Sequence, residues 1–394
     1  MADPIRIRET ATACGHRLGI ATLDAPSALN ALSLAMVDAL QTQLTQWATD
    51  PDVVAVVLDG TGEKAFCAGG DLRDLYQSIR DCGGAPNAYA RQFFTREYRL
   101  DYLIHTYPKP LLCWGNGIVM GGGLGLMAGA SHRIVTERTR IAMPEIGIGL
   151  FPDVGGSWFL NRMPARTGLF LALTGAPLNA ADALFAGLAD CQLPQASHGS
   201  LLEAMARTRW HRNAGADAVV LSHLVQTEAQ AWSSGQPAPA DAQAAPTADV
   251  PGATPPATAP SNLRACYDEI RVLIGHDGLA DIAARLEQAA GTDTWIGAAA
   301  SNFRRGSPTS AALAYSLLRR ARHLSLREVF QMELDAAVGC CAHQDFAEGI
   351  RALLIDKDRQ PRWQPAKLAD VDAALVEDHF KPRYAGANPL ADLR

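Results

Sequence analysis

Two acidic residues stand in an apolar stretch rich in glycine and proline, over residues 143–156. They are Glu145 and Asp153, and no charged side chain lies between them. A loop this apolar is expected to be buried, and burial disfavours the charged form of a carboxyl group and raises its pKa, which suits acid–base catalysis. Two acids in one pocket can also take different roles. The alternative is that both carboxyls only cap helices, and Asp153 is well placed to cap one over the next residues.

Two glycine-rich loops could place backbone amides against a ligand. The first covers residues 64–71, with the sequence KAFCAGGD, and the second covers residues 120–125, with the sequence MGGGLG. Each is expected to connect a strand to a helix, where the first N–H groups of the helix are unsatisfied and favour negative charge. If the loops face each other, one amide from each forms an oxyanion hole, which stabilises charge developing on a carbonyl oxygen.

These motifs also have alternative explanations. The first loop could be a tight turn with Asp71 as a helix cap, and the second could let a helix pack closely on a sheet. Gly123, Gly125 and Ala128 match a loose dinucleotide-binding pattern, but the nearest expected strand ends several residues earlier, which weakens the match. Glu97 lies between two arginines, and the residues alone favour a salt-bridged helix face there.

The composition argues against several classes of protein. The chain has 394 residues, of which 48% are hydrophobic and 19% charged, and its net charge is −6. These values do not suit a disordered chain or one that coats nucleic acid. No Gly-x-Ser-x-Gly sequence indicates a serine hydrolase, and no histidines or cysteines have metal-ligand spacing. The eight cysteines are scattered, so we expect reduced thiols in a reducing compartment.

The sequence favours a cytoplasmic location without membrane contact. The N-terminal residues contain no long apolar run behind a basic start, so no secretory signal peptide is expected. The acidic residues there fit a transit peptide poorly. No stretch of about 18 uninterrupted apolar residues exists that would span a membrane.

Alternating strands and helices must position the loops. We predict strands at 6–12, 17–23, 53–58, 110–114, 134–135 and 141–142, and helices at 33–47, from 71, at 88–106 and at 124–130. Further along the chain we predict helices at 279–290, 310–321, 326–337 and 346–354. The pattern therefore predicts an α/β fold class, with an α/β body followed by a helical C-terminal part.

Several motifs in this order resemble the crotonase (enoyl-CoA hydratase/isomerase) superfamily. They are the sequence NAL at 30–32, the loop at 64–71, the triple glycine at 121–123 and the sequence MPE at 143–145. The resemblance implies a spiral of ββα units, an acyl-CoA thioester substrate and an oxyanion hole. By position, the hole would consist of the backbone amides of Gly70 and Gly122.

Two positions distinguish the branches of this superfamily. The resemblance implies that true hydratases carry a catalytic glutamate where this chain has Gly125, and a glycine where it has Asp153. The chain is instead similar to the 3-hydroxyisobutyryl-CoA hydrolase family at 94–98, 120–123, 142–156, 172–175, 307–310 and 346–358. This similarity implies hydrolysis of a short 3-hydroxyacyl-CoA, 3-hydroxyisobutyryl-CoA being favoured, to the free acid and coenzyme A in valine catabolism. The alternatives are an enoyl-CoA hydratase or isomerase, a silent acyl-CoA binder and a dinucleotide oxidoreductase.

The resemblance also assigns roles to individual residues. It makes Glu145 and Asp153 catalytic together with the Gly70 and Gly122 amides. The substrate-contacting positions that it implies, including those of the first loop, are Glu97, Gly122, Glu145, Asp153, Lys64, Ala65, Ala68 and Gly69. The candidates for binding the phosphates of coenzyme A are Lys64, Arg73 and Lys357. No metal or further cofactor is implied, since coenzyme A belongs to the substrate.

The composition and the resemblance together predict how the chain is divided, although the family usually has a plain helical connection where this chain has its proline-rich segment. We expect a spiral core at 1–200, a helical connection at 201–232 and a flexible insertion at 233–261 that contains seven prolines. A helical C-terminal part at 262–394 would cover the active site. The expected partner is a small acyl-CoA and not nucleic acid, and both a monomer and a homo-oligomer remain open.

Overall fold

The computed structural model describes residues 4–83, 86–234, 259–275 and 278–394. Within these ranges, the strands are β1 (Ile5–Ala11), β2 (Arg17–Leu23), β3 (Val53–Gly60), β4 (Ala65–Cys67), β5 (Leu111–Gly115), β6 (Ile118–Met120), β7 (His132–Val135), β8 (Arg140–Ala142) and β9 (Cys191–Gln192). They form a six-stranded sheet in the order β1-β2-β3-β5-β7-β9 and a three-stranded sheet in the order β4-β6-β8. All neighbouring strands are parallel except β1 and β2.

Successive strands alternate between the two sheets. β3, β5 and β7 enter the large sheet, and the strand that follows each of them, β4, β6 or β8, enters the small one. Each pair of strands thus makes one turn of a spiral. The loops that follow β4, β6 and β8 in successive turns therefore lie next to one another. The predicted α/β class and spiral of ββα units are confirmed.

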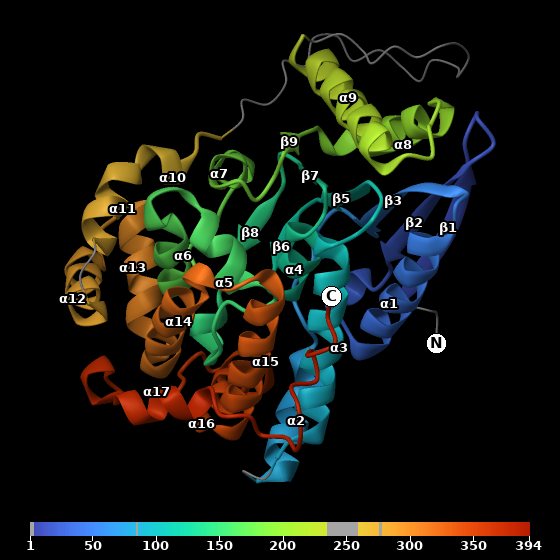
Figure 1. Cartoon of the computed structure of the whole chain (residues 1–394). Helices are drawn as coiled ribbons and strands as arrows, with labels where there is room; N and C mark the ends of the chain where they lie inside the picture. The colour runs from blue at the N-terminus through green and yellow to red at the C-terminus, as the bar shows by residue number, and fades with distance from the viewer. Residues whose placement is uncertain (1–3, 84–85, 235–258, 276–277) are drawn as a thin grey trace.

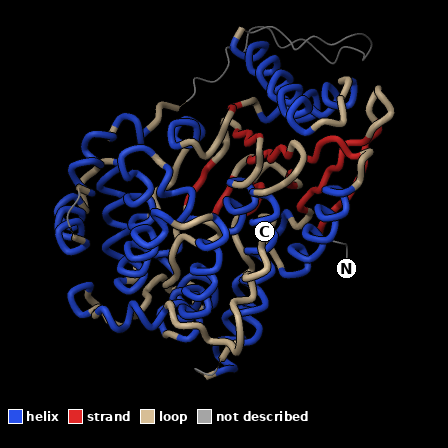
Figure 2. Tube along the Cα trace, in the orientation of Figure 1, coloured by secondary structure: helices blue, strands red, loops and turns tan. Residues whose placement is uncertain are grey.

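Helices lie above and below the strands in the view of Figure 2 and make up most of the rest of the fold. Those of the first part are α1 (Leu34–Thr49), α2 (Leu72–Cys82), α3 (Ala88–His105), α4 (Gly122–Ala128), α5 (Gly156–Phe159), α6 (Thr167–Thr174), α7 (Ala180–Ala186), α8 (His198–Arg207) and α9 (Ala214–Ser233). The remaining α-helices of the described chain are α10 (Asn262–Ala265), α11 (Tyr267–Ile274), α12 (Leu279–Ala289), α13 (Trp295–Arg305), α14 (Pro308–Arg320), α15 (Leu326–Ala342), α16 (Gln344–Ile350) and α17 (Ala373–His379).

The first elements show why the sequence folds as it does. Every residue of β3 up to Asp59 is buried, as expected for a parallel strand covered on both faces. Ser33 accepts a hydrogen bond from the Met36 amide and begins α1, and the apolar side of this helix ends at Trp47. The Trp47 ring packs on β2 at Gly19, where an added Cβ would lie 2.6 Å from a ring carbon.

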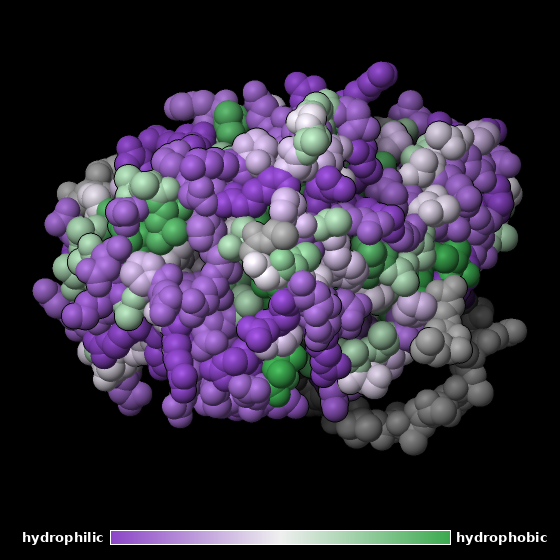
Figure 3. Space-filling view, turned by 90° about the horizontal axis from the view of Figure 1, so that it is seen from below, coloured by the Kyte–Doolittle hydropathy of each residue, from purple (hydrophilic) through white to green (hydrophobic). Residues whose placement is uncertain are grey.

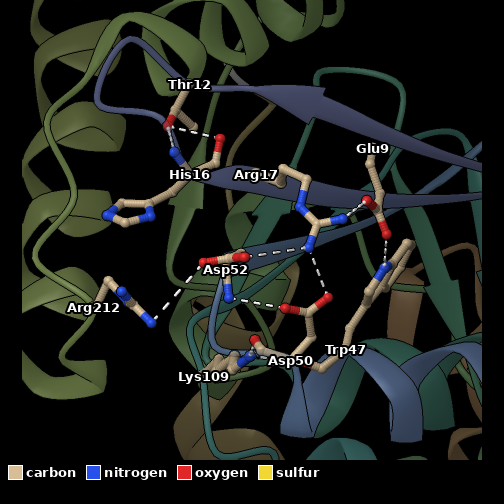
Figure 4. A network of polar contacts seen from close by, with 9 residues as sticks. All are labelled: Glu9, Thr12, His16, Arg17, Trp47, Asp50, Asp52, Lys109 and Arg212. Carbon is tan, nitrogen blue, oxygen red and sulfur yellow. Dashed lines mark hydrogen bonds and ion pairs between the residues drawn. The ribbon is translucent and has the colours of Figure 1, made fainter.

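A network of polar contacts fixes the edge of the large sheet against α1 (Figure 4). Arg17 on β2 contacts Glu9 of β1 at 2.6 Å and Asp50 at 2.8 Å, so it joins the first two strands of the sheet to the end of α1. Glu9 also accepts a hydrogen bond of 2.8 Å from the Trp47 indole N–H. The three side chains of these ion pairs are about one-third exposed, so the pairs add little to the stability of the fold. Their main effect is to fix the alignment of the first two strands with the end of α1.

Each predicted strand and helix corresponds to an observed element, but several elements were not predicted, among them the helices α6 and α13. The short strands β4, β6 and β9 were not predicted, and β4 lies inside the first glycine-rich loop. The helix expected from Leu124 already begins at Gly122, because β6 ends directly before Gly121. The expectation that the nearest strand ends several residues before these glycines is therefore wrong.

The C-terminal helices pack against the core and end in a tail across α3 (Figure 1). Leu390 and Leu393 of the tail are buried. Arg99 of α3 pairs with Asp392 at 2.7 Å, and the Tyr102 hydroxyl donates to the backbone oxygen of Arg394. The face in Figure 3 is mainly hydrophilic, with small separate hydrophobic patches.

The predicted insertion at 233–261 lies outside the described residues except at its two ends. There, Ser233 ends α9 and Ser261 caps α10 by accepting a hydrogen bond from the Arg264 amide. In the described parts of the chain, no helix combines the length and apolar character needed to cross a membrane.

Candidate active site

A cavity of about 630 Å³ lies between the core and the C-terminal helices. Gly70, Gly122, Glu97, Glu145 and Asp153 all line it. The opposite wall comes from the C-terminal part, where its lining residues include Asn302, Arg305, Gly306, Gly349, Ala352, Leu353, Leu354, Arg359 and Pro361. The structure thus brings together the five residues to which the resemblance gave the principal roles.

The two glycine-rich loops lie side by side because β4 and β6 pair in the small sheet. Gly123 sits so close to β4 that an added Cβ would overlap the Cys67 carbonyl oxygen. An added Cβ at Gly121 would lie 3.6 Å from the Cα of Gly69. Both alternatives named for these loops are therefore also true, since glycine permits close packing here and Asp71 caps α2 through the Arg73 amide.

Two amide hydrogens of these loops remain outside the regular hydrogen-bond pattern. Gly122 is the first residue of α4, and an N–H at that position has no partner within its helix. Leu32 and Gly70 form a parallel bridge that uses the Gly69 oxygen and the Asp71 amide, which leaves out the Gly70 N–H. One donor from each loop is therefore available to a carbonyl oxygen in the cavity.

Glu145 begins a short 3-10 helix, η2 (Glu145–Ile148), directly after β8 and the following turn. Its side chain is buried, and its Oε2 atom has no hydrogen-bond partner within the described chain. Its Oε1 atom would lie 3.2 Å from a Cβ added at Gly121. The Glu145 carboxyl therefore stands beside the second glycine-rich loop, at the carboxyl end of the small sheet.

Asp153 does not cap a helix with its side chain. α5 begins at Gly156, and its N-cap residue is Gly155, without a side-chain hydrogen bond to the helix. The Asp153 carboxyl instead accepts a hydrogen bond of 2.8 Å from the hydroxyl of Tyr98 on α3. The interpretation of Glu145 and Asp153 as caps only is therefore wrong.

Glu97 also departs from the interpretation based on its neighbours. Arg96 pairs with Asp38 at 2.6 Å and Arg99 pairs with Asp392, so the arginines point away from Glu97. Glu97 is only 3% exposed, and its Oε1 atom would lie 2.5 Å from a Cβ added at Gly122. The salt-bridged helix face is wrong for Glu97, which is buried and lines the cavity.

The carboxyl groups of the site change each other's ionisation. Burial and the nearby Asp153 raise the pKa of both Glu97 and Glu145 well above the usual range. Burial also raises the pKa of Asp153, to about 6, although the Tyr98 hydrogen bond acts in the opposite direction. A carboxyl group whose pKa is raised by burial exchanges its proton nearer to neutral pH than a free one, which suits acid–base catalysis.

Basic side chains line the cavity at only some of the predicted positions. Arg73 lines it, together with Arg305 and Arg359, which were not predicted. Lys64 and Lys357 are exposed and lie outside the lining.

The first loop reaches the cavity at Ala68 and Gly69 but not at Ala65. Ala65 begins β4, and its side chain is buried in the core. Any contact of Lys64 or Ala65 with the substrate would have to lie beyond this cavity, so their predicted role is not supported by its lining.

Three buried polar residues near the site were not predicted from the sequence. Tyr98 binds Asp153, Asp101 lies one helical turn from Glu97, and Glu333 of α15 binds the loop after Asp153. A signal existed for Asp101, because it shares an otherwise apolar helical stripe with Glu97. No local pattern in the sequence distinguishes Glu333, because its neighbours along the chain are typical of any amphipathic helix.

Comparison with known proteins shows extensive similarity. Residues 18–380 match the family described as Enoyl-CoA hydratase/isomerase. The 3-hydroxyisobutyryl-CoA hydrolase, mitochondrial, of Gallus gallus is 36% identical over 364 residues, which are 92% of this chain and 86% of the relative. The Homo sapiens protein of the same name is 32% identical over 363 residues, with the same coverage.

Two solved structures cover nearly the whole chain. One is described as an enoyl-CoA hydratase from Rhodobacter sphaeroides 2.4.1, with 36% identity, a TM-score of 0.76 and coverage of 96% of this chain and 97% of the other. The second is described as a carnitinyl-CoA dehydratase from Mycobacterium thermoresistibile, with 34% identity, a TM-score of 0.78 and coverage of 97% of both chains.

Proposed function

The chain belongs to the enoyl-CoA hydratase/isomerase family, and we propose that within this family it is an acyl-CoA thioester hydrolase. The proposed substrate is a short 3-hydroxyacyl-CoA, 3-hydroxyisobutyryl-CoA being favoured, as in valine catabolism. One observation carries the proposal: two backbone amides and three buried carboxyl groups surround one cavity, while position 125 bears no side chain. The names of the vertebrate relatives support the same reaction.

In the proposed reaction the thioester oxygen accepts hydrogen bonds from the Gly70 and Gly122 amides. Negative charge develops on this oxygen as the carbonyl carbon is attacked, and fixed donors stabilise it without reorganising. Glu145 either attacks the carbon itself, giving a mixed anhydride that water then hydrolyses, or removes a proton from an attacking water. The carbon–sulfur bond breaks, and coenzyme A leaves as a thiol after protonation.

Asp153 and Glu97 complete the proposed mechanism. Asp153 orients the water or the substrate hydroxyl and carries a proton between them and the leaving group, for which a pKa of about 6 is suited. Glu97 holds the acyl end by hydrogen bonding. The products are the free 3-hydroxy acid and coenzyme A.

The second candidate function is hydration of an enoyl-CoA, which the similarity to the Rhodobacter sphaeroides protein described as an enoyl-CoA hydratase favours. The two-carboxylate form of that reaction would use an acid at position 125. A Cβ added to Gly125 would lie only 2.6 Å from the Cβ of Val154, so this space is already filled. We therefore place hydration second.

A thiol-release assay over a panel of short acyl-CoA thioesters tests the proposal. We expect 3-hydroxyisobutyryl-CoA to be hydrolysed fastest and 3-hydroxypropionyl-CoA to follow, because one methyl group is worth about 1–3 kcal/mol of discrimination. Crotonyl-CoA should not be hydrated. Hydration of crotonyl-CoA without release of thiol would support the second candidate and contradict the first.

We further propose that the reaction needs no metal or added cofactor. The amides and carboxyl groups named above suffice for attack, charge stabilisation and proton transfer. Thiol release should therefore be unchanged after dialysis against a chelator. A loss that added metal restores would contradict this proposal.

A reducing compartment, such as the cytoplasm, is also proposed. All eight cysteines lie in the described part of the chain and are free. The curated vertebrate relatives carry "mitochondrial" in their names, which describes those proteins. Fractionation of cells that express the intact gene would test the location, and activity confined to an organelle would contradict a cytoplasmic one.

A further inference from the structure

Glu333 is a buried acid that the proposed mechanism does not use. It lies on α15 in the C-terminal part and is fully buried. Each of its carboxyl oxygens accepts one backbone N–H, at 2.8 Å, from Gly155 and from Ser157. No basic side chain forms an ion pair with Glu333 anywhere in the described ranges. Its two backbone contacts therefore define its role.

The turn that Glu333 binds has an unusual backbone. Val154 has φ of 52° and Gly155 has φ of 84°. A β-branched residue at positive φ is strained, and such a conformation persists only when its surroundings determine it. α5 begins just after this turn and lacks a side-chain cap from its own N-cap residue. Glu333 supplies the missing acceptors from a distant helix.

Asp153 precedes this turn directly, so the turn determines where its carboxyl group points. On one side Tyr98 of α3 donates to that carboxyl. On the other side Glu333 holds the two amides that follow. Phe330, one turn before Glu333 on α15, packs against Tyr98 with ring centroids 5.8 Å apart. α15 therefore contacts both sides of the Asp153 position.

We propose that Glu333 is a positioning residue for thioester hydrolysis, holding the turn at residues 154–157 so that the Asp153 carboxyl stays against Tyr98 and the cavity. The inference rests on the function proposed above. It means that the C-terminal part completes the active site as well as covering it. Burial raises the pKa of Glu333 to about 8. Desolvation of its charged form therefore destabilises the protein, which is unusual for a residue without a role beside the site.

The Glu333→Gln variant tests this role. Glutamine keeps the shape of the side chain, but its NH₂ group replaces one carboxyl oxygen and cannot accept a hydrogen bond from the backbone N–H that this oxygen binds. We expect kcat on the best thioester of the panel to fall by about ten- to hundred-fold, since small displacements of a catalytic group cost this much. KM should change less than three-fold, because Glu333 does not touch the cavity.

Asp217→Asn is the matched control. Asp217 is also buried, and each of its oxygens accepts one backbone N–H, from His211 at 2.7 Å and from Asn213 at 3.0 Å. It lies on α9, away from the lining of the cavity. We expect both variants to lower Tm but only Glu333→Gln to lower kcat. Equal kcat values in the two variants would overturn the proposal.

A crystal structure of Glu333→Gln separates this inference from the proposed function. We expect the Asp153 carboxyl to leave the Tyr98 hydroxyl, a result that does not depend on which substrate is hydrolysed. If the hydrogen bond keeps its length of 2.8 Å, the positioning role is wrong even in an active enzyme. If the wild-type protein releases no thiol, the proposed function is wrong. The distance between Tyr98 and Asp153 in the variant still tests whether Glu333 positions Asp153. Glu333→Asp, which keeps the carboxyl group but is shorter, serves if the glutamine variant does not fold.

Discussion

The hydrogen bond between Tyr98 and Asp153 links the architecture of the site to its pH dependence. If Asp153 acts in its ionised form, kcat/KM should fall as the pH drops below about 6. Tyr98→Phe removes a donor that lowers the pKa of Asp153, so the acidic limb should move to higher pH. The shift should be on the order of one pH unit, since a hydrogen bond to a charged group is worth about 1.5–3 kcal/mol.

A pH–rate profile of both proteins measures this shift. Tyr102→Phe is a suitable control on the same helix, because the Tyr102 hydroxyl binds the tail and not the site. A limb that stays at the same pH in Tyr98→Phe would show that Asp153 is not the group that titrates.

Glu145 carries the largest expected single effect. Glu145→Gln keeps the size of the side chain but removes the group proposed as nucleophile or base, so we expect thiol release to fall by at least about 10²-fold. Asp153→Asn should also lower the rate of thiol release. The loss should be smaller than in Glu145→Gln if the only role of Asp153 is to carry protons. Near-normal release by Glu145→Gln in a correctly folded protein would contradict the mechanism.

The residues of the site could be predicted to different degrees. Glu145 and Asp153 were visible in the sequence because an apolar loop with two acids is chemically unusual. Glu97 was selected only through the family resemblance, since its arginine neighbours favoured a surface role. Tyr98 and Glu333 act through contacts 55 and 178 residues apart in sequence, and local patterns carry no information on such contacts.

At the scale of the elements, close packing of α4 on β4 places the two amide donors. Gly123→Ala would insert a Cβ into the Cys67 carbonyl oxygen and push the helix away from the strand. We expect a loss of about 1–3 kcal/mol in the free energy of unfolding. Activity should fall as well, because Gly122 and Gly70 would separate.

Gly199→Ala provides the control in another helix. Apart from the neighbouring backbone of α8 itself, no described atom lies within 4 Å of a Cβ added at Gly199, so stability should be unchanged or slightly higher. Chemical denaturation and thiol release measure both effects. A Gly123→Ala variant with normal activity would show that the amide positions do not depend on this contact.

The longer elements could be predicted from periodicity, whereas the short strands could not. β4 and β6 have three residues each, too few to show an alternating pattern, and each borders a loop rich in glycine. They form because β6 pairs with both β4 and β8 in the small sheet, which is a tertiary effect. This is why the expected start of α4 was two residues late.

At the scale of the molecule, one chain supplies both walls of the cavity. The core contributes the amides and acids, and the C-terminal part contributes the opposite wall and Glu333. The sequence predicted that a helical part would cover the site because the resemblance extends to it. It could not show that this part also binds the loop of Asp153, since the contact depends on how α15 packs against α3 and α5.

The tail at 388–394 connects the C-terminal part of the chain to α3 of the core. Removing it would expose the core around Leu390 and Leu393, each of which contributes about 1.5–3 kcal/mol by burial. The shortened chain should therefore unfold at a Tm lower by roughly 5 °C or more. Loosening of α3, which carries Glu97 and Tyr98, should reduce kcat before the protein unfolds.

Differential scanning calorimetry and thiol release near the transition test this expectation together. Asp392→Asn is the control, because it weakens only the exposed ion pair with Arg99, and such pairs contribute about 0–1 kcal/mol. If the shortened chain and Asp392→Asn show the same Tm, the buried leucines do not hold the tail. If Tm falls but kcat near the transition does not, α3 keeps its place without the tail.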